Sequence, residues 1–325
     1  MPRAGRESYE GYEALLRSYH ERGLTDGLPI VPPTAERVES FLAAAGLLPE
    51  EILGTVPTRE VVATAEACAV NAVMAGCLPE YAPVVMAAVR AHLEEKANCH
   101  SSTGTLTGAA HAVIVHGPVR REVGISCRAG CFGPGTRANA TIGRALRLVI
   151  RNVCRAVPGG LDRATFSKPA RYSFCFGEDE EGSDWIPMHE ERGFPAGSSA
   201  VTVHSNTDRY AAWDPEMRSP ESLLDIFVCT ARAREIRQDD WLGEERNMVI
   251  VVGPEHRDFL VSSGWTKQDV RDYLFPRLTQ PSGGGEEKHH LHRADGILIV
   301  AAGGPGMAES WILYPHLALA TTRAV

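Results

Sequence analysis

Three short runs of apolar, β-branched residues end in the same way, and this shared ending constrains the fold more than any other feature of the sequence. Residues 113–118, 249–254 and 299–306 each contain such a run, and each run closes on glycine and proline. Runs of this length and composition are typical of buried strands that lead into turns. Two further runs, 172–176 and 200–204, also predict strands, and helical patterns lie between them. This alternation predicts an α/β fold.

The repeated ending leaves two interpretations open. The three runs could be copies of one strand–turn unit whose turns gather around a single site, because open α/β sheets bind ligands at the carboxyl ends of their strands. Alternatively, a common preference for Gly-Pro turns produces the same pattern without a shared site. In both cases residues 297–302 form the last strand that the sequence predicts.

The first hundred residues have a different pattern. Prolines in residues 25–33 predict a rigid extended segment between the first two helices. We therefore expect a mainly helical N-terminal region, residues 1–108, followed by a mixed α/β core, residues 109–325, which carries the site and the strand-Gly-Pro turns. The helices predicted in the first region are 7–22, 34–45, 59–75 and 79–95.

The composition excludes several classes of protein. The chain has 325 residues, of which 44% are hydrophobic, and this allows one large domain or two with a sizeable core. A formal charge of −8 and the lack of a nucleic-acid-binding motif argue against nucleic acid as a partner. No apolar window is long enough to span a membrane, so we expect a cytoplasmic protein that binds no membrane. The 8 cysteines are irregularly spaced, which predicts free thiols rather than a disulfide framework.

One stretch is strongly basic within this acidic chain. Residues 120–171 contain eleven Lys or Arg and two Asp or Glu. A glycine-rich turn in this stretch leads into a helix predicted to reach Val157. Free N–H groups and the positive end of the helix dipole at such a turn favour an anion. We therefore expect a small anionic substrate here, and the predicted ligands are Gly133, Gly135, Arg137, Asn139 and Arg144.

Arg144 also begins a stripe of arginines along this helix. Arg147, Arg151 and Arg155 follow it at intervals of three, four and four residues, so the four side chains share one helix face. An alternative interpretation is that the last three form a solvated face paired with the acidic run at residues 178–184.

Cys127 and Cys131 lie just before the glycine-rich turn. Nearby Arg128 and Arg137, together with the following helix, would lower the pKa of either thiol and favour a reactive thiolate. His116, at the end of a strand, is the predicted general base. The alternative interpretation is that both cysteines are small residues that fill space beneath a loop.

Other candidate groups follow the predicted strands. Glu180 follows the strand at 172–176 and is the predicted catalytic carboxylate. Gly303 and Gly304 would let a phosphate or carboxylate approach the backbone, but the chain lacks the P-loop and dinucleotide-binding patterns, so we expect no nucleotide. As an alternative to thiol chemistry, histidines could hold a divalent metal such as zinc. The histidines considered for this role are His100, His111, His116, His289, His290, His292 and His316.

Five longer phrases occur together in the chain: residues 26–34, 71–77, 132–145, 190–194 and 302–306. Together they resemble a bacterial family associated with UGSC-motif proteins, in which selenocysteine or cysteine precedes Gly-Ser-Cys. The resemblance covers nearly the whole chain and implies thiol or selenol redox chemistry. This chain contains no Cys-Gly-Ser-Cys.

These observations predict a thiol-dependent oxidoreductase that acts on a small anionic metabolite. Cys127 would attack or exchange electrons, with Cys131 as the resolving thiol and His116 moving the proton, and this mechanism needs no cofactor. A hydrolase or lyase that uses His, Glu and Arg, with or without a divalent metal, is the first alternative. A non-catalytic partner subunit of a UGSC-type redox protein is the second. A second copy of the chain or a redox partner protein also stays open as a partner.

Overall fold

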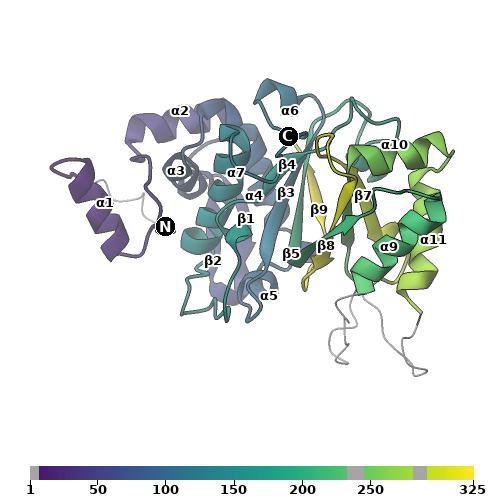
Figure 1. The fold of residues 1–325 in the computed structure, drawn as a ribbon. Coiled ribbons are helices and arrows are strands. Elements are labelled where there is room, and N and C mark those ends of the chain that lie inside the picture. The colour runs from purple at the N-terminus through teal and green to yellow at the C-terminus, as the bar shows by residue number, and fades with distance from the viewer. Residues whose placement is uncertain (1–6, 233–244, 281–290) are drawn as a thin grey trace.

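The computed structural model describes residues 7–232, 245–280 and 291–325, and it confirms the predicted α/β class. These residues form a mixed seven-stranded sheet with helices on both sides, and a helical region precedes the sheet (Figure 1). None of the helices in these ranges combines the length and the apolar composition that crossing a membrane requires.

The secondary structure consists of the following elements. The described α-helices are α1 (Tyr12–Glu21), α2 (Ala35–Ala45), α3 (Ala65–Ala75), α4 (Ala82–His92), α5 (Cys99–Thr103), α6 (Val119–Glu122), α7 (Arg137–Leu148), α8 (Met188–Glu191), α9 (Pro220–Arg232), α10 (Pro254–Ser262) and α11 (Lys267–Leu278). The strands are β1 (Ile52–Val56), β2 (Val61–Thr64), β3 (Ala110–His116), β4 (Cys175–Gly177), β5 (Ala200–Trp213), β6 (Met248–Val252), β7 (Ile297–Ala301), β8 (Glu309–Pro315) and β9 (Thr321–Ala324).

Strand β5 lies at the centre of the seven-stranded sheet. The order of strands is β4-β3-β5-β8-β6-β7, and β9 pairs with β5. β3 is parallel to β4 and β6 to β7, whereas β5 and β8 run antiparallel to their neighbours. β5 has 14 residues, and its first half pairs with β3 while its second half pairs with β8, with a register shift between Asn206 and Arg209. This long strand therefore joins two halves of the sheet.

Successive side chains of each strand point to opposite faces of the sheet, and one face of each half packs against the same face of the other half. Val113 of β3 packs into one core with α2, α3, α4 and α7. Ile250 of β6 and Ile299 of β7 pack into a second core with α9, α10 and α11. The opposite faces share a third core, which contains Ile114 of β3 and Val251 of β6. The sheet is therefore folded over, with helices covering its two outer faces. The first core includes residues on both sides of the predicted boundary at residue 108, which stays a prediction.

Folding over brings the carboxyl ends of β4 and β7 together. The N–H of Asp179, just after β4, donates to the carbonyl of Ala301 at the end of β7, with a distance of 2.7 Å. Two residues further on, the N–H of Gly303 donates to the carbonyl of Cys127 at 2.9 Å. The chain after β7 therefore lies against both the end of β4 and the loop that contains Cys127.

The other two Gly-Pro endings lie at the same place. The N–H of Gly117, after β3, donates to a carboxylate oxygen of Glu180 at 2.6 Å. Arg257, in the helix that begins at the Gly-Pro ending of β6, lies 3.4 Å from a carboxylate oxygen of Asp179. All three endings thus meet around residues 178–181, which agrees with the interpretation that the turns gather at one place.

Three expectations about the elements are wrong. Residues 59–75 are not one helix, because β2 precedes α3 and pairs with β1. Glu60, in the left-handed region with a φ of 53°, turns the chain back so that the β-branched run can pair. The strand at 200–204 continues to Trp213, and β8 and β9 follow β7, so β7 is not the last strand. Polar residues in β8 interrupt the apolar pattern from which a strand would be predicted.

Gly117 allows a test of how closely the strand ends fit. Its φ is +78°, and a Cβ added there would lie 2.0 Å from the carbonyl oxygen of Ser198, whereas Gly124 has a φ of +71° and open space. We expect Gly117→Ala to lower the free energy of unfolding by about 2 kcal/mol more than Gly124→Ala, because only the first adds a clash to backbone strain. Urea unfolding measures the difference, and equal losses would contradict the close fit.

Candidate functional site

Four side chains that can bind a metal or move protons meet beside the joined strand ends. They are His116 at the end of β3, Glu178 and Glu180 after β4, and His189 in α8. One donor atom of each lies within 4.8 Å of those of the other three. Both histidines and Glu178 are buried, and Glu180 is partly buried. We call these four residues the histidine–glutamate cluster.

Hydrogen bonds hold the His116 ring from two sides. Its Nδ1 lies 2.8 Å from a carboxylate oxygen of Glu178, and its Nε2 lies 3.0 Å from the hydroxyl of Thr202. Since a carboxylate only accepts, Nδ1 carries the proton and Nε2 accepts from Thr202. The ring also stacks on that of His189, with 5.4 Å between the centroids. These contacts fix both the tautomer and the orientation of the ring.

Glu178 is ionised although it is buried. Its two carboxylate oxygens accept from the N–H of Met188 at 3.1 and 2.9 Å, and the ammonium of Lys267 lies 3.5 Å away. Burial by itself raises the pKa of Glu178, but Lys267 and His116 outweigh burial and lower this pKa to about 2. The cluster therefore holds a negative charge at neutral pH.

His189 is the member of the cluster that lacks hydrogen bonds. Its side chain is fully buried, and neither ring nitrogen has a partner among the described residues. The nearest carboxylate oxygen, from Glu180, lies 3.9 Å from Nδ1, which is too far for a hydrogen bond. Burial, and then the neighbouring His116, lower the pKa of His189, so its ring is neutral at pH 7 and keeps a lone pair. Buried polar groups are nearly always paired, so this ring indicates a missing ligand.

Arg120 holds the carboxylate segment in place. Its guanidinium is buried and lies 2.9 Å from carboxylate oxygens of both Glu180 and Glu181. It also donates to the carbonyl of Glu178 at 2.6 Å. One cation thus positions three residues of the segment 178–181, which helps to keep the two imidazoles and two carboxylates of the cluster in a fixed arrangement. Such a donor set suits zinc, manganese or iron, and the same groups can transfer protons.

The lowered thiol pKa predicted for Cys127 and Cys131 is wrong. Burial, and then the carboxylate of Asp179, raise the pKa of Cys127, whose sulfur lies 3.9 Å from that carboxylate. Arg120, 4.0 Å from the sulfur, opposes this rise without reversing it. Burial raises the pKa of Cys131 to about 11. The helix that was expected to favour a thiolate begins only at Arg137.

Two of the predicted anion ligands make contacts within the protein. Arg137 donates twice to the carbonyl of Gly76, at 3.2 and 3.0 Å, and so caps the end of α3. Asn139 is buried, and its amide bonds to the N–H and the carbonyl of Ser126 at 2.8 and 2.9 Å. Both side chains therefore hold other segments in place.

The four predicted glycine ligands have different surroundings. Gly133 and Gly135 are exposed in the turn before α7. Gly303 and Gly304 face the loop that contains Cys127, and a Cβ at Gly304 would lie 2.5 Å from Ala129. Close approach between two chain segments accounts for glycine at position 304.

Arg144 forms a two-point ion pair with Asp26. Its Nε and Nη2 each lie 2.8 Å from a carboxylate oxygen, and Nη2 also donates to the carbonyl of Pro29 at 2.9 Å. The two charged side chains are largely buried, with 13% and 15% of their surface exposed. This pair ties the extended segment before α2 to α7.

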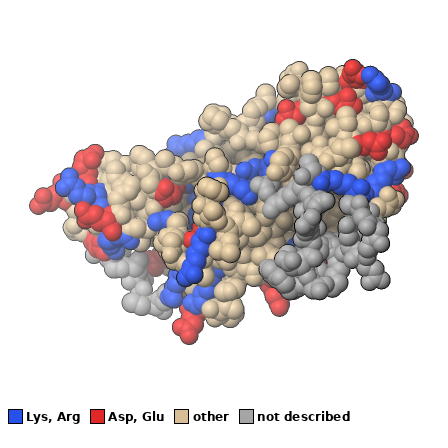
Figure 2. Space-filling model, turned by 60° about the horizontal axis from the view of Figure 1, so that its bottom comes forward, with Lys and Arg blue, Asp and Glu red and all other residues tan. Residues whose placement is uncertain are grey.

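Arg147 and Arg151, the next two arginines of the stripe, line a pocket. Arg147 is buried and donates to the carbonyl of Arg171 at 3.2 Å, and burial lowers its pKa to about 9. The solvated-face interpretation is therefore wrong for Arg147, although Arg155 is exposed. Basic side chains are prominent in the middle of the face turned forward in Figure 2. The pocket has a volume of about 340 Å³, and its charged lining residues are Asp26, Arg147, Arg151, Asp162, Lys168 and Arg171.

Of the histidines considered as metal ligands, His116 is the one that the described structure places in a cluster of possible ligands. His111 is buried at the opposite end of β3, where its Nδ1 lies 3.1 Å from Arg147. His100 and His292 are exposed, His316 is buried after β8, and His289 and His290 lie outside the described residues.

Three residues that complete the site could not be predicted from the sequence. His189, Arg120 and Lys267 come from three different helices, and each lies far along the chain from at least one of its partners. Lys267 directly follows the helix cap Thr266, and a lysine in a sequence is expected to be exposed rather than buried. The available signal is the polar segment 178–181 that follows a buried strand, which locates the site but not its cations.

The ion pair of Asp26 with Arg144 should make stability depend on pH in acid. Burial tends to raise the pKa of Asp26, but the hydrogen bonds and charge of Arg144 outweigh burial and lower it. Its stabilisation is therefore complete above the unfolded pKa of about 3.9 and disappears as the pH falls through the folded pKa. We expect Asp26→Asn to lower the free energy of unfolding by about 2 kcal/mol at neutral pH, and by progressively less in acid.

Urea unfolding between about pH 7 and pH 2.5 measures this dependence. The control is Glu36→Gln, which changes an exposed acid on α2 and should alter stability by less than about 0.5 kcal/mol. A loss in Asp26→Asn that stays constant down to the lowest pH would contradict the assignment.

Thiol labelling tests the corrected view of the cysteines. All eight are free thiols, and Cys229 is exposed. Because the pKa values of Cys127 and Cys131 are raised, we expect neither to react faster with iodoacetamide at pH 6 than Cys229 does. Mass spectrometry of the native protein at several times gives the rates. Rapid labelling of Cys127 at pH 6 would restore the thiolate prediction.

The sequence matches no protein-family model and no curated protein.

Proposed function

We propose that this protein is an enzyme, a metal-dependent hydrolase or lyase that acts on a small anionic metabolite. The observation that carries the proposal is the histidine–glutamate cluster, in which four donor groups lie within 4.8 Å of one another. The unpartnered ring of His189 supports a ligand at this point, because a divalent ion would use the lone pair that the described residues leave unused.

Each residue of the cluster has a role in this proposal. A divalent ion held by the four side chains would polarise a substrate oxygen and lower the pKa of a water molecule. Lys267 keeps Glu178 ionised, and Arg120 keeps the carboxylate of Glu180 beside the ring of His189. An ion on Nδ1 of His116 would displace the proton that Nδ1 shares with Glu178, and Nε2–H would then donate to Thr202, as metal-bound histidines commonly do to their partners.

The charges around the cluster favour an anionic substrate. Arg120 and Lys267 pair with the two carboxylates of the cluster, so a bound divalent ion would add positive charge there. Arg121 and Arg128, with 67% and 62% of their side chains exposed, pair with Glu181 and Asp179 on the same edge of the sheet. The positive charge that a bound ion adds beside these paired groups would attract anions from solution.

A second candidate function is hydrolysis without a metal. Thr202, His116 and Glu178 form a chain of hydroxyl, imidazole and carboxylate with distances of 3.0 and 2.8 Å. The same order of groups activates the nucleophile in acyl-transfer enzymes. In this mechanism the hydroxyl of Thr202 is the nucleophile and His116 the base. Thr202 also shares a hydrogen bond with the hydroxyl of Thr322 at 2.9 Å.

Metal binding tests the first candidate without knowledge of the substrate. The probe is Mn²⁺, which prefers oxygen and imidazole donors to thiolates, and free Mn²⁺ is measured by electron paramagnetic resonance. We expect one tight site per chain, weakened by at least about tenfold in His189→Gln and in Glu180→Gln. The control is His100→Gln, which removes an exposed histidine outside the cluster. A folded wild-type protein that binds no Mn²⁺ would overturn the metal proposal.

Activity toward small esters and amides that carry a carboxylate or a phosphate separates the remaining candidates. Activity that is lost on chelation and restored by Mn²⁺ supports the metal-dependent enzyme. Activity that survives chelation but disappears in Thr202→Val selects the second candidate. Activity that is lost on thiol alkylation and in Cys127→Ser would instead assign the nucleophile to Cys127.

A further inference from the structure

A second group of possible metal ligands lies far from the histidine–glutamate cluster. It consists of His92 at the end of α4, Cys99 at the start of α5, and Cys154. Cys154 follows a turn of π-helix, Val149–Val153, which extends α7. The three donor atoms lie within 4.8 Å of one another, and all three residues are buried. We call this group the thiol–histidine cluster.

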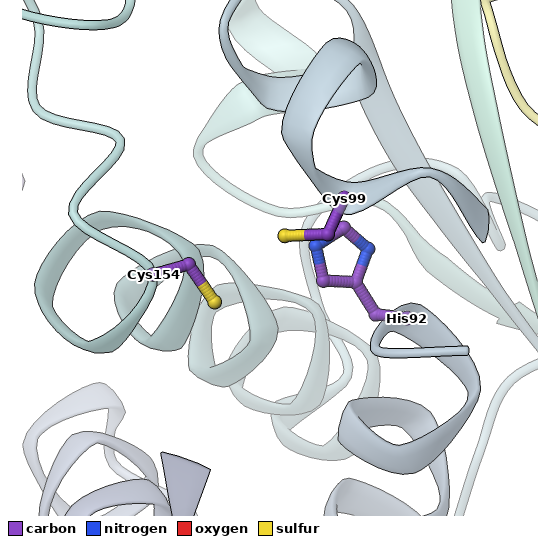
Figure 3. A group of neighbouring side chains, drawn as sticks. All are labelled: His92, Cys99 and Cys154. Atoms are coloured by element: carbon purple, nitrogen blue, oxygen red, sulfur yellow. The ribbon is translucent and has the colours of Figure 1, made fainter. Parts of the chain in front are cut away.

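The two sulfur atoms point toward each other, with the His92 ring beside Cys99 (Figure 3). Neither ring nitrogen of His92 has a hydrogen-bond partner among the described residues, although the residue is only 1% exposed. A buried polar group without a partner destabilises a protein by about 1–3 kcal/mol, so such groups usually have a ligand. The edge of this ring contacts His111, and that contact satisfies neither nitrogen of His92.

A cation lies beside the thiol–histidine cluster. Arg59 donates to the carbonyl of Cys154 at 2.7 Å and to that of Cys99 at 3.2 Å, which places a guanidinium beside both thiols. Thiolate is the form of cysteine that binds metals.

We propose that His92, Cys99 and Cys154 bind one zinc ion. Two thiolates and one imidazole are a donor set that selects zinc among the common divalent ions. A disulfide between the two cysteines would use both sulfurs but would leave the His92 ring without a partner, whereas zinc accounts for all three side chains. Binding displaces the remaining thiol protons into solution. Three protein ligands leave the fourth tetrahedral position for water or a small ligand.

Cobalt substitution tests this site on the unmodified protein. Reduced protein is titrated with Co²⁺, which takes the tetrahedral geometry of zinc and gives a near-ultraviolet charge-transfer band only when thiolates bind it. We expect this band to saturate at one equivalent and to disappear when Zn²⁺ is added. A reduced, folded protein that gives no thiolate band would overturn the proposal. So would a Cys99–Cys154 disulfide that re-forms in air in the presence of one equivalent of Zn²⁺.

Substitutions show which residues bind the Co²⁺ ion that gives the charge-transfer band. Cys99→Ser, Cys154→Ser and His92→Gln should each weaken Co²⁺ binding by at least about tenfold. The controls are Cys127→Ser and Cys229→Ser, which remove the two more accessible thiols and should leave the band unchanged. His189→Gln should also leave it unchanged, which separates this site from the histidine–glutamate cluster. A band that persists in both Cys99→Ser and Cys154→Ser would show that other thiols bind the ion and would overturn the assignment.

Discussion

The structure depends on neutralising a charged segment that lies between the two halves of a folded sheet. Residues 178–181 are four consecutive acids, and an unpaired buried charge destabilises a protein by several kcal/mol. Each acid therefore meets a cation or a buried histidine, and these partners come from different elements around the strand ends. The same pairing that makes burial tolerable also fixes those elements relative to one another. The partners are His116, Arg120, Arg128, Arg257 and Lys267.

Much of the fold could be predicted because it depends on local pattern. The buried strands at 113–116 and 249–252, and the Gly-Pro turns after them, follow from β-branched runs and turn residues. The strand β8 could not be found in this way, because Glu309, Ser310 and Pro315 break its apolar run and its central place in the sheet arises from pairing with β5 and β6. Strand β2 and helix α3 likewise share one continuous apolar pattern, and only the helix cap at Thr64 separates them.

The candidate sites were less predictable because their chemistry depends on distant neighbours. Cys127 lies close in sequence to Arg128 and was expected to be acidic, yet Asp179, more than fifty residues later, has the larger effect on its thiol. Cys99 and Cys154 are fifty-five residues apart, so no spacing motif marks them. Strand β3 connects the two regions, since His111 touches the ring of His92 at one end and His116 lies in the other cluster, about 17 Å away along the strand.

The central position of β5 also determines the order in which the protein can assemble. Its first half lies between β3 and β9, and Val203 pairs with Thr321, more than a hundred residues later. The hydroxyl of Thr202 bonds both to His116 and to Thr322. A chain emerging from the ribosome can therefore form its N-terminal helices early, but His116 reaches its final surroundings only after β9 has been synthesised. Truncated or stalled chains would carry most of the site's residues without the strand that orders them.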